Sequence, residues 1–179
     1  MNDLVVQNVP TNLNDALEWK STHFGRKVAI IENYLRGAES YMIVGFFLTE
    51  AYDAEDWKLD GSGANSFFEW VEKEIKIKRS NAQRMMLIWK TLYPYITRHY
   101  ELIKQIDFSK LAMVCPMLGS LTESETMDWL HMAKELTVKD LESAIKSKKG
   151  LPTQDDCDHI NTEPWYKCRR CGKFLKEIV

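Results

Sequence analysis

The chain has 179 residues, of which 45 % are hydrophobic, and its net charge at pH 7 is −2. This length and apolar content are enough for a core without disulfide bonds, which excludes a small disulfide-stabilised scaffold. The N-terminal residues lack the basic and apolar segments of a secretory signal. The longest apolar run, from Met42 to Leu48, is far shorter than the roughly 20 residues that span a bilayer. We therefore expect a soluble, cytoplasmic protein that does not contact a membrane.

The first half of the chain has the periodicity of helices. Apolar residues recur at steps of three or four from Leu13 to Tyr52, and Gly37 marks a kink or a break. Residues 54–64 are polar and glycine-containing, so they are predicted to form a loop. The next helix is short, and its apolar face comprises Phe67, Phe68, Trp70, Val71 and Ile75. A further helix is predicted from about Ser80 to Leu92.

Start and stop signals define the helices of the second half. Pro94 is expected in the first turn of a helix, and Asp107 or Ser109 caps a segment that stops before Pro116. Thr122-Glu-Ser-Glu125 is a capping box that opens a helix through Lys134, and Thr137 starts the last helix, which ends before Gly150.

The resulting fold class is all-α, because no strand pattern precedes the C-terminal tail. We expect three parts: a helical domain over residues 1–149, a linker over 150–156 and a zinc-binding module over 157–179.

The tail has the ligands of a structural zinc site. It reads Cys157-Asp-His159, then eight residues, then Cys168-Arg-Arg-Cys171-Gly172. Zn²⁺ in structural sites prefers four tetrahedral nitrogen or sulfur ligands. The pattern therefore predicts one zinc ion held by Cys157, His159, Cys168 and Cys171, with no open position for catalysis. Asp156, Asp158 or a residue of the helical domain are alternatives to His159, and a redox cysteine pair or a tail without metal remain the competing interpretations.

A local positive charge marks the middle of the chain. No Asp or Glu falls between Glu74 and Glu101, although the whole chain is slightly acidic. Six basic residues occupy this stretch: Lys76, Lys78, Arg79, Arg84, Lys90 and Arg98. Such a cluster is typical of a surface that meets nucleic acid.

Residues 67–92 have the apolar pattern of a helix-turn-helix. The predicted interior between its two helices comprises Val71, Ile75, Ile77, Ala82 and either Met85 or Met86. Ser80, Asn81, Gln83 and Arg84 then lie near the start of the recognition helix, where such side chains suit base edges. Lys76, Lys78 and Arg79 are placed to contact phosphates. Glu72 stands where the motif usually has a small residue, and Lys76 where it usually has glycine. A helical hairpin with a solvated basic face explains the same residues.

Two resemblances to known families accompany these motifs. Residues of about 157–174 are similar to the short zinc ribbons and knuckles that end many phage and plasmid proteins. Residues of roughly 28–149 resemble helical helix-turn-helix proteins of phages and mobile elements, through Phe67-Phe-Glu-Trp70 and Arg79-Ser-Asn-Ala-Gln-Arg84. The segment at 136–141 is similar to the DNA-binding region of ParB- and KorB-like partition proteins. These resemblances imply a DNA-associated or regulatory role and transfer no catalytic residue.

The sequence favours a regulatory protein that binds double-stranded DNA through the helix-turn-helix. The zinc tail would either add contacts from Arg169 and Arg170 or only brace the C-terminus. Helix-turn-helix proteins commonly read paired half-sites, which suggests a homodimer. No enzyme is expected, since Gly61-Ser-Gly63 lacks the lysine of a phosphate loop and no nucleophile motif occurs. The alternative is an adaptor or inhibitor that engages a host protein, suggested by the acidic residues of 123–142.

Overall fold

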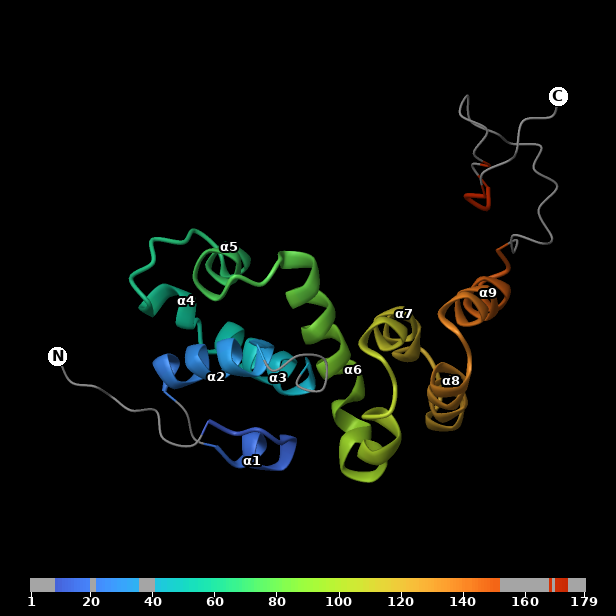
Figure 1. Ribbon diagram of the computed structural model, residues 1–179, viewed down its shortest axis with the longest axis horizontal. Coiled ribbons are helices and arrows are strands. Elements are labelled where there is room, and N and C mark those ends of the chain that lie inside the picture. The colour runs from blue at the N-terminus through green and yellow to red at the C-terminus, as the bar shows by residue number, and fades with distance from the viewer. Residues whose placement is uncertain (1–8, 20–21, 36–40, 152–167, 169, 174–179) are drawn as a thin grey trace.

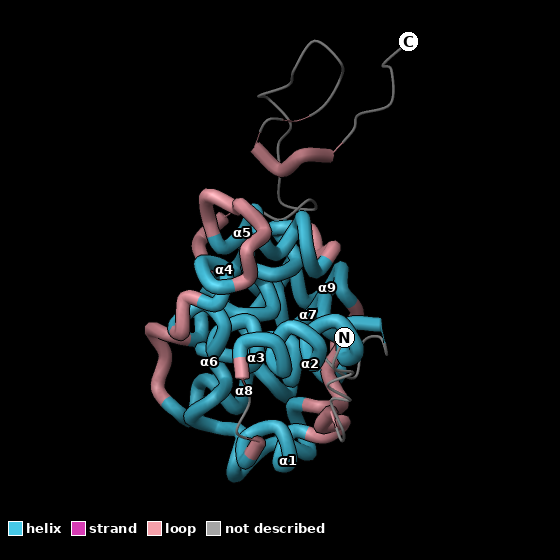
Figure 2. The backbone as a smooth tube through the Cα atoms, turned by 90° about the vertical axis from the view of Figure 1, so that its left-hand side faces the viewer, coloured by secondary structure: helices cyan, strands magenta, loops and turns pink. Residues whose placement is uncertain are grey.

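A computed structural model of the protein describes residues 9–19, 22–35, 41–151, 168 and 170–173. Helices form most of this part of the chain, and none of its residues belongs to a β-strand (Figures 1 and 2). The all-α prediction is confirmed. The elements are α1 (Leu13–Glu18), α2 (His23–Leu35), α3 (Tyr41–Asp53), α4 (Asp56–Leu59), α5 (Phe67–Trp70), the π-helical segment η2 (Val71–Ile75), α6 (Arg79–Ile103), α7 (Phe108–Leu118), α8 (Glu123–Glu135) and α9 (Val138–Lys148).

The long helix α6 joins two groups of helices. On one side it packs on α3, which in turn packs on α2 and α1. On the other side it packs on α7, which carries α8 and α9 (Figure 1). Both groups depend on α6, so the position of this helix fixes the whole arrangement.

The seat of α6 on α3 is a close approach of two backbones. Gly45 lies on α3 where a Cβ atom would come within 2.4 Å of the carbonyl oxygen of Met85 on α6. A larger residue at this position would have to displace the backbone of α6, which moves less easily than a flexible side chain. Gly45 therefore sets the spacing between the two helices.

A buried ion pair attaches the short helix α4 to α2. The Arg26 guanidinium donates to both carboxylate oxygens of Asp56, from Nε at 2.7 Å and from Nη2 at 2.6 Å. Asp56 is fully enclosed, and the two parallel hydrogen bonds satisfy its charge. The prediction of a continuous loop over 54–64 is therefore wrong, because this long-range pair stabilises a helical turn inside it.

Two prolines lie inside helices rather than at their boundaries. α6 continues through Pro94, so the prediction of a separate helix beginning there is wrong. Leu92 and Ile96 on either side are buried, and their packing holds the helix across the hydrogen bond that proline cannot donate. α7 likewise continues past Pro116 to Leu118.

The predicted signals of the last helices are confirmed. Thr122 and Glu125 form the reciprocal hydrogen bonds of a capping box at the start of α8. The Thr137 side chain accepts a hydrogen bond from the Asp140 N–H at the start of α9, and Gly150 has a φ of +64° just beyond its end. Across the described ranges, no helix combines the length and the apolar character needed to cross a membrane.

Candidate nucleic-acid interface

Residues 67–92 fold into two helical segments joined by a tight turn. The first segment comprises α5 and η2, the second is the beginning of α6, and residues 76–78 connect them. All the predicted interior residues are buried: Val71, Ile75, Ile77, Ala82, Met85 and Met86. The apolar pattern was thus read correctly, and it defines one hairpin with a common core.

Lys76 takes the conformation that glycine usually supplies in this turn. Its φ of 66° and ψ of 25° lie in the left-handed region. Its N–H donates to the carbonyl oxygen of Val71, and its Nζ donates to the carbonyl oxygen of Lys73 at 2.6 Å. The backbone therefore turns as a glycine-containing turn would, while the position keeps a basic side chain.

One face of α6 carries four of the predicted contact residues. Arg79, Ser80, Gln83 and Arg84 are exposed, and helical geometry places them within one arc of the helix. Ala82 and Met85 lie on the opposite, buried side. We call the exposed set Arg79, Ser80, Gln83 and Arg84 the outer face of α6.

Asn81 does not belong to the outer face. It is half-buried on the inner side of the helix, where it lines a cavity together with Tyr41 and Met85. The structure therefore brings together four of the predicted contact residues of α6 and places the fifth elsewhere.

Some charged side chains around the turn have partners within the protein, and others have none among the described residues. Glu72 Oε1 accepts a hydrogen bond from the Arg79 N–H at 2.8 Å, so this carboxylate occupies the N-terminus of α6. The Arg79 guanidinium lies over the Phe68 ring at 5.2 Å. Lys78 and Arg84 form no ion pair within the described part of the chain. The favourable site for an anion at this helix end thus contains an acidic group, with unpaired cations beside it.

Aromatic rings support the outer face, and the sequence pattern did not indicate that Tyr52 is one of them. Phe68 contacts Phe67, whose ring meets Tyr52 of α3 edge to face at 5.2 Å. Lys90 lies over the Tyr52 ring at 5.7 Å. Tyr52 is far from Arg79 in sequence, so no local spacing could have indicated that both belong to one surface.

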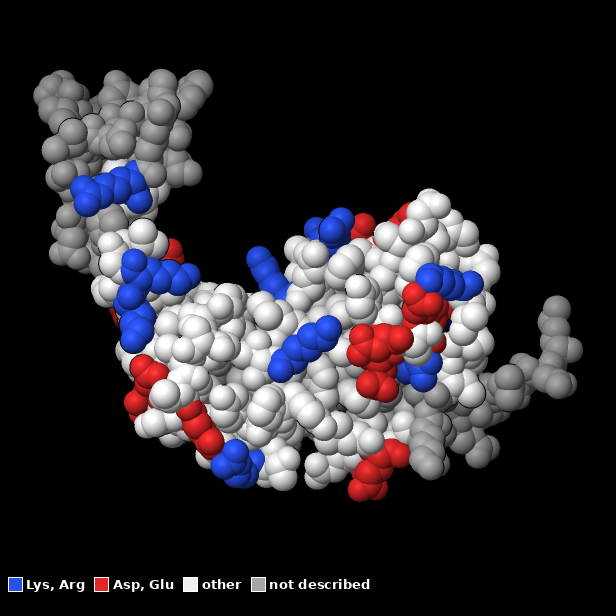
Figure 3. Space-filling model, turned by 180° about the vertical axis from the view of Figure 1, so that it is seen from behind, with Lys and Arg blue, Asp and Glu red and all other residues white. Residues whose placement is uncertain are grey.

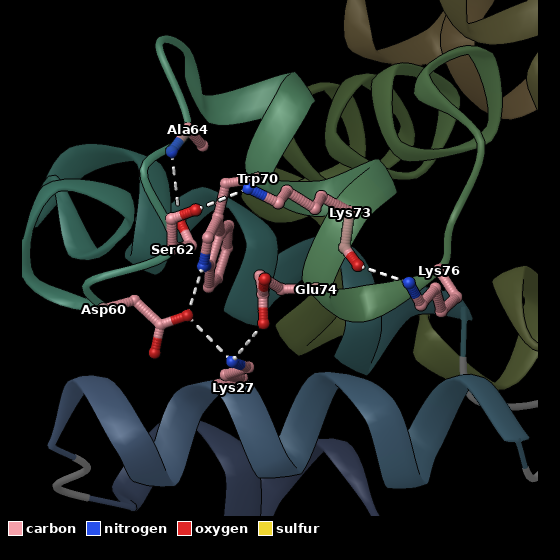
Figure 4. Close-up of polar contacts among 8 residues, drawn as sticks. All are labelled: Lys27, Asp60, Ser62, Ala64, Trp70, Lys73, Glu74 and Lys76. Atoms are coloured by element: carbon pink, nitrogen blue, oxygen red, sulfur yellow. Dashed lines mark hydrogen bonds and ion pairs between the residues drawn. The ribbon is translucent and has the colours of Figure 1, made fainter.

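A polar network anchors the first helical segment to α2 (Figure 4). Lys27 Nζ contacts Asp60 Oδ2 at 2.8 Å and Glu74 Oε2 at 3.1 Å, and the Trp70 Nε1–H donates to the same oxygen of Asp60 at 2.8 Å. Burial raises the pKa of Asp60, but the hydrogen bonds from Lys27 and Trp70 outweigh it and hold that pKa below its ordinary value. We call Lys27, Asp60, Trp70 and Glu74 the clamp.

The positive charge is local rather than general. On the face shown in Figure 3, basic and acidic side chains are interspersed and separated by uncharged surface. The chain as a whole carries −2. An attraction for nucleic acid would therefore have to come from the acid-free stretch between Glu74 and Glu101.

The described part of the zinc-ligand prediction is the Cys168–Lys173 turn. Both thiols are buried, the Cys168 N–H donates to the Lys173 carbonyl oxygen at 2.8 Å, and the Gly172 N–H donates to the Cys168 carbonyl oxygen at 2.7 Å. Gly172 has a φ of +77°, which only glycine adopts readily. Two sulfur ligands offered by one tight turn suit a tetrahedral zinc site.

The other predicted ligands, Cys157 and His159, lie outside the described residues, as does Arg169. Among the residues that the structure describes, no three potential metal ligands are grouped together. Arg170 is exposed within the turn.

Comparisons with protein-family models, with curated proteins and with solved structures give no match. The geometry of the hairpin and of the cysteine turn therefore has to carry the functional argument.

Proposed function

We propose that the protein is a DNA-binding regulator, of the kind found in phages and other mobile elements, that inserts the start of α6 into the major groove. The observation that carries this proposal is the outer face: Arg79, Ser80, Gln83 and Arg84 lie together at the beginning of a helix that follows a tight, basic turn. Arginine suits guanine, glutamine suits adenine, and Lys76 and Lys78 suit the flanking phosphates.

The test is a titration of the protein with double-stranded DNA from a randomised pool, read by gel shift or fluorescence anisotropy at two salt concentrations. Arg79→Ala with Arg84→Ala should weaken binding at least about tenfold and reduce the dependence of affinity on salt. The matched control is Lys139→Ala with Lys148→Ala, which removes two exposed cations of α9 instead.

Equal affinities of the wild type and the arginine variant would overturn the proposal. An equal loss of DNA affinity in the control variant would show that DNA is attracted by net charge alone. That result would also contradict α6 as a recognition helix. Circular dichroism should show unchanged helix content in both variants, because all four side chains are exposed.

A structural zinc ion in the tail is the second part of the proposal. The buried thiols and the glycine turn of 168–172 support it, with Cys157 and His159 as the remaining ligands. Zinc would order this short segment and place Arg169 and Arg170 near the DNA backbone. One zinc per chain by mass spectrometry is expected, and Cys168→Ser should remove it. If His159→Ala leaves the stoichiometry at one, the fourth ligand lies elsewhere.

The second candidate function is a protein-binding adaptor or inhibitor. The acidic side chains of α8 and α9 favour it, because Asp128, Glu135 and Glu142 are exposed on a surface that would repel phosphates. Specific capture of one host regulator, together with no retention of the protein on DNA at low salt, would support this function over the first.

A further inference from the structure

A cavity of about 420 Å³ lies where α2, α3, α6 and α7 meet. That volume falls within the range of sites for small organic ligands. Its described lining residues are mostly aromatic or aliphatic: Tyr34, Leu35, Tyr41, Val44, Asn81, Met85 and Phe108. None of these side chains carries a charge, so the chemistry of the walls favours a neutral ligand.

The walls also define the shape of the ligand. Tyr34, Tyr41 and Phe108 present three aromatic rings, and the rings of Tyr41 and Phe108 contact each other with their centroids 5.5 Å apart. Tyr41 OH already donates to the carbonyl oxygen of Ile106 at 3.4 Å. The planes of the Tyr41 and Phe108 rings are tilted by 54°, so a planar ligand ring can stack on one of them and lie tilted to the other.

Asn81 supplies the one amide of the lining. Among the described residues its side chain takes part in no hydrogen bond, although it is half-buried beside apolar groups. Because the side chain is only half-buried, a molecule in the cavity can reach its amide group. A carboxamide offers one donor and one acceptor side by side, so its complement is a ring edge with an adjacent N–H and carbonyl.

The cavity lies directly behind the outer face. Asn81 and Met85 line it from the same first turns of α6 that carry Ser80 and Arg84 on the other side. At Met85 the helix cannot move toward α3, because Gly45 already touches its backbone. A molecule that fills the cavity beside Asn81 would therefore act on the first turn of α6, with the Gly45–Met85 contact as the pivot.

We propose that this cavity binds a neutral, planar, two-ring heteroaromatic molecule with a lactam edge that pairs with Asn81, and that binding alters the affinity of the outer face for DNA. The ligand site stands on the cavity alone, whereas its regulatory effect rests on the proposed DNA-binding function.

The first experiment measures binding to the whole chain without DNA. The probe is the lactam quinolinone, and its N-methyl derivative is the matched control, since it keeps the rings and the carbonyl but loses the N–H. Titration by calorimetry and by NMR chemical shifts should show about tenfold tighter binding of the lactam, the expected loss for one unmade hydrogen-bonding pair. No binding of either probe at millimolar concentration would overturn the site.

Variants distinguish the contribution of the Asn81 amide to ligand binding from that of the aromatic lining. Asn81→Leu keeps the side-chain size and removes the amide, so the lactam should bind about tenfold more weakly and no better than its N-methyl derivative. Phe108→Leu should weaken both probes to the same degree. Gln83→Leu, which changes an amide on the outer face of the same helix, should leave the preference for the lactam intact. Retention of that preference in Asn81→Leu would contradict the assignment of the edge.

The second experiment repeats the DNA titration with the cavity saturated by the lactam. We expect a change in DNA affinity of at least about fivefold, the lower end of usual allosteric coupling. An unchanged affinity would overturn the regulatory effect and leave the ligand site standing. If the protein binds the lactam but binds no DNA, the ligand site is supported and the proposed DNA-binding function is overturned.

Discussion

The hairpin of 67–92 and the consecutive helices α8 and α9 differ in their packing and in the charge of their surfaces. In the hairpin of 67–92, the turn is basic, Lys76 is left-handed and the distant Glu72 occupies the N-terminus of α6. Helices α8 and α9 instead both pack on α7, with Leu130, Ala133 and Leu141 buried. Thr137 caps α9 locally, and the exposed acidic side chains of these two helices are mixed with lysines such as Lys139 and Lys148. The two regions therefore share buried apolar residues and differ in the charges at the start of their second helices, α6 and α9.

The largest effect on stability should come from the contact between α3 and α6, which carries the hairpin of 67–92. Gly45→Ala would place a Cβ atom 2.4 Å from the carbonyl oxygen of Met85, so α6 would have to move away from α3. We expect a loss of about 3 kcal/mol in the free energy of unfolding, measured by urea denaturation. Gly119→Ala at the end of α7 is the control, because a Cβ atom there meets nothing within 4 Å. Equal stabilities of the two variants would contradict the close approach.

The clamp should make the stability of the hairpin of 67–92 depend on pH. Asp60→Asn removes a carboxylate that accepts from Lys27 and Trp70, and we expect a loss of about 2 kcal/mol. The pKa of Asp60 is held below its ordinary 3.8, so its contribution is present above that pH and is lost as the pH falls through the lower, folded-state value.

The measurement is the free energy of unfolding between pH 2 and pH 7, the range over which carboxylates titrate in proteins (roughly pH 2–6). The fall at the acidic end should be shallower in Asp60→Asn than in the wild type. Asp128→Asn, an exposed carboxylate of α8, should retain the wild-type profile. Identical acidic limbs in all three proteins would show that the clamp does not couple stability to pH.

Removal of the hydrogen-bonding groups at the starts of α6 and α9 should show which of them affects DNA binding as well as stability. Glu72→Ala and Thr137→Ala each free one N–H at a helix start, so each should cost about 1 kcal/mol of stability. Only Glu72→Ala should also strengthen DNA binding, because it removes a negative charge beside Arg79. Thermal denaturation and the DNA titration check the pair, and weaker DNA binding by Glu72→Ala would argue against an anion at this end of α6.

The smallest expected effect concerns the left-handed turn. Lys76→Gly relieves a conformation that costs an L-residue roughly 1 kcal/mol, so it should stabilise the protein by up to about that amount. It should also weaken DNA binding through the loss of one cation. Glu55→Gly relieves the other left-handed residue among those described and should stabilise without any loss of affinity. Unchanged affinity in Lys76→Gly would remove this residue from the interface.

The sequence predicted what depends on neighbouring residues. The hairpin interior, from Val71 to Met86, follows from apolar spacing within short helices, and the caps at Thr122 and Thr137 are local hydrogen bonds. Pro94 misled the prediction because tertiary packing of Leu92 and Ile96 overrides the usual boundary signal.

Long-range contacts could not be predicted. The Lys27–Asp60 ion pair and the cavity at Asn81 join segments that are distant in the chain, and no local pattern reports which residues will meet. The four-ligand zinc site stays a prediction, because two of its ligands lie outside the described residues.

The contact between Gly45 and Met85 also has a consequence for folding. It joins residues about forty positions apart, so α3 and α6 can dock only after the intervening chain has closed into a loop. Closing this loop costs conformational entropy, whereas forming a single helix needs no such closure. We therefore expect the outer face to be fully positioned only after α3 and α6 have docked. Any partner that recognises the outer face would bind the folded chain alone and raise its midpoint of thermal unfolding, which makes a melting curve a direct first assay for candidate DNA sequences.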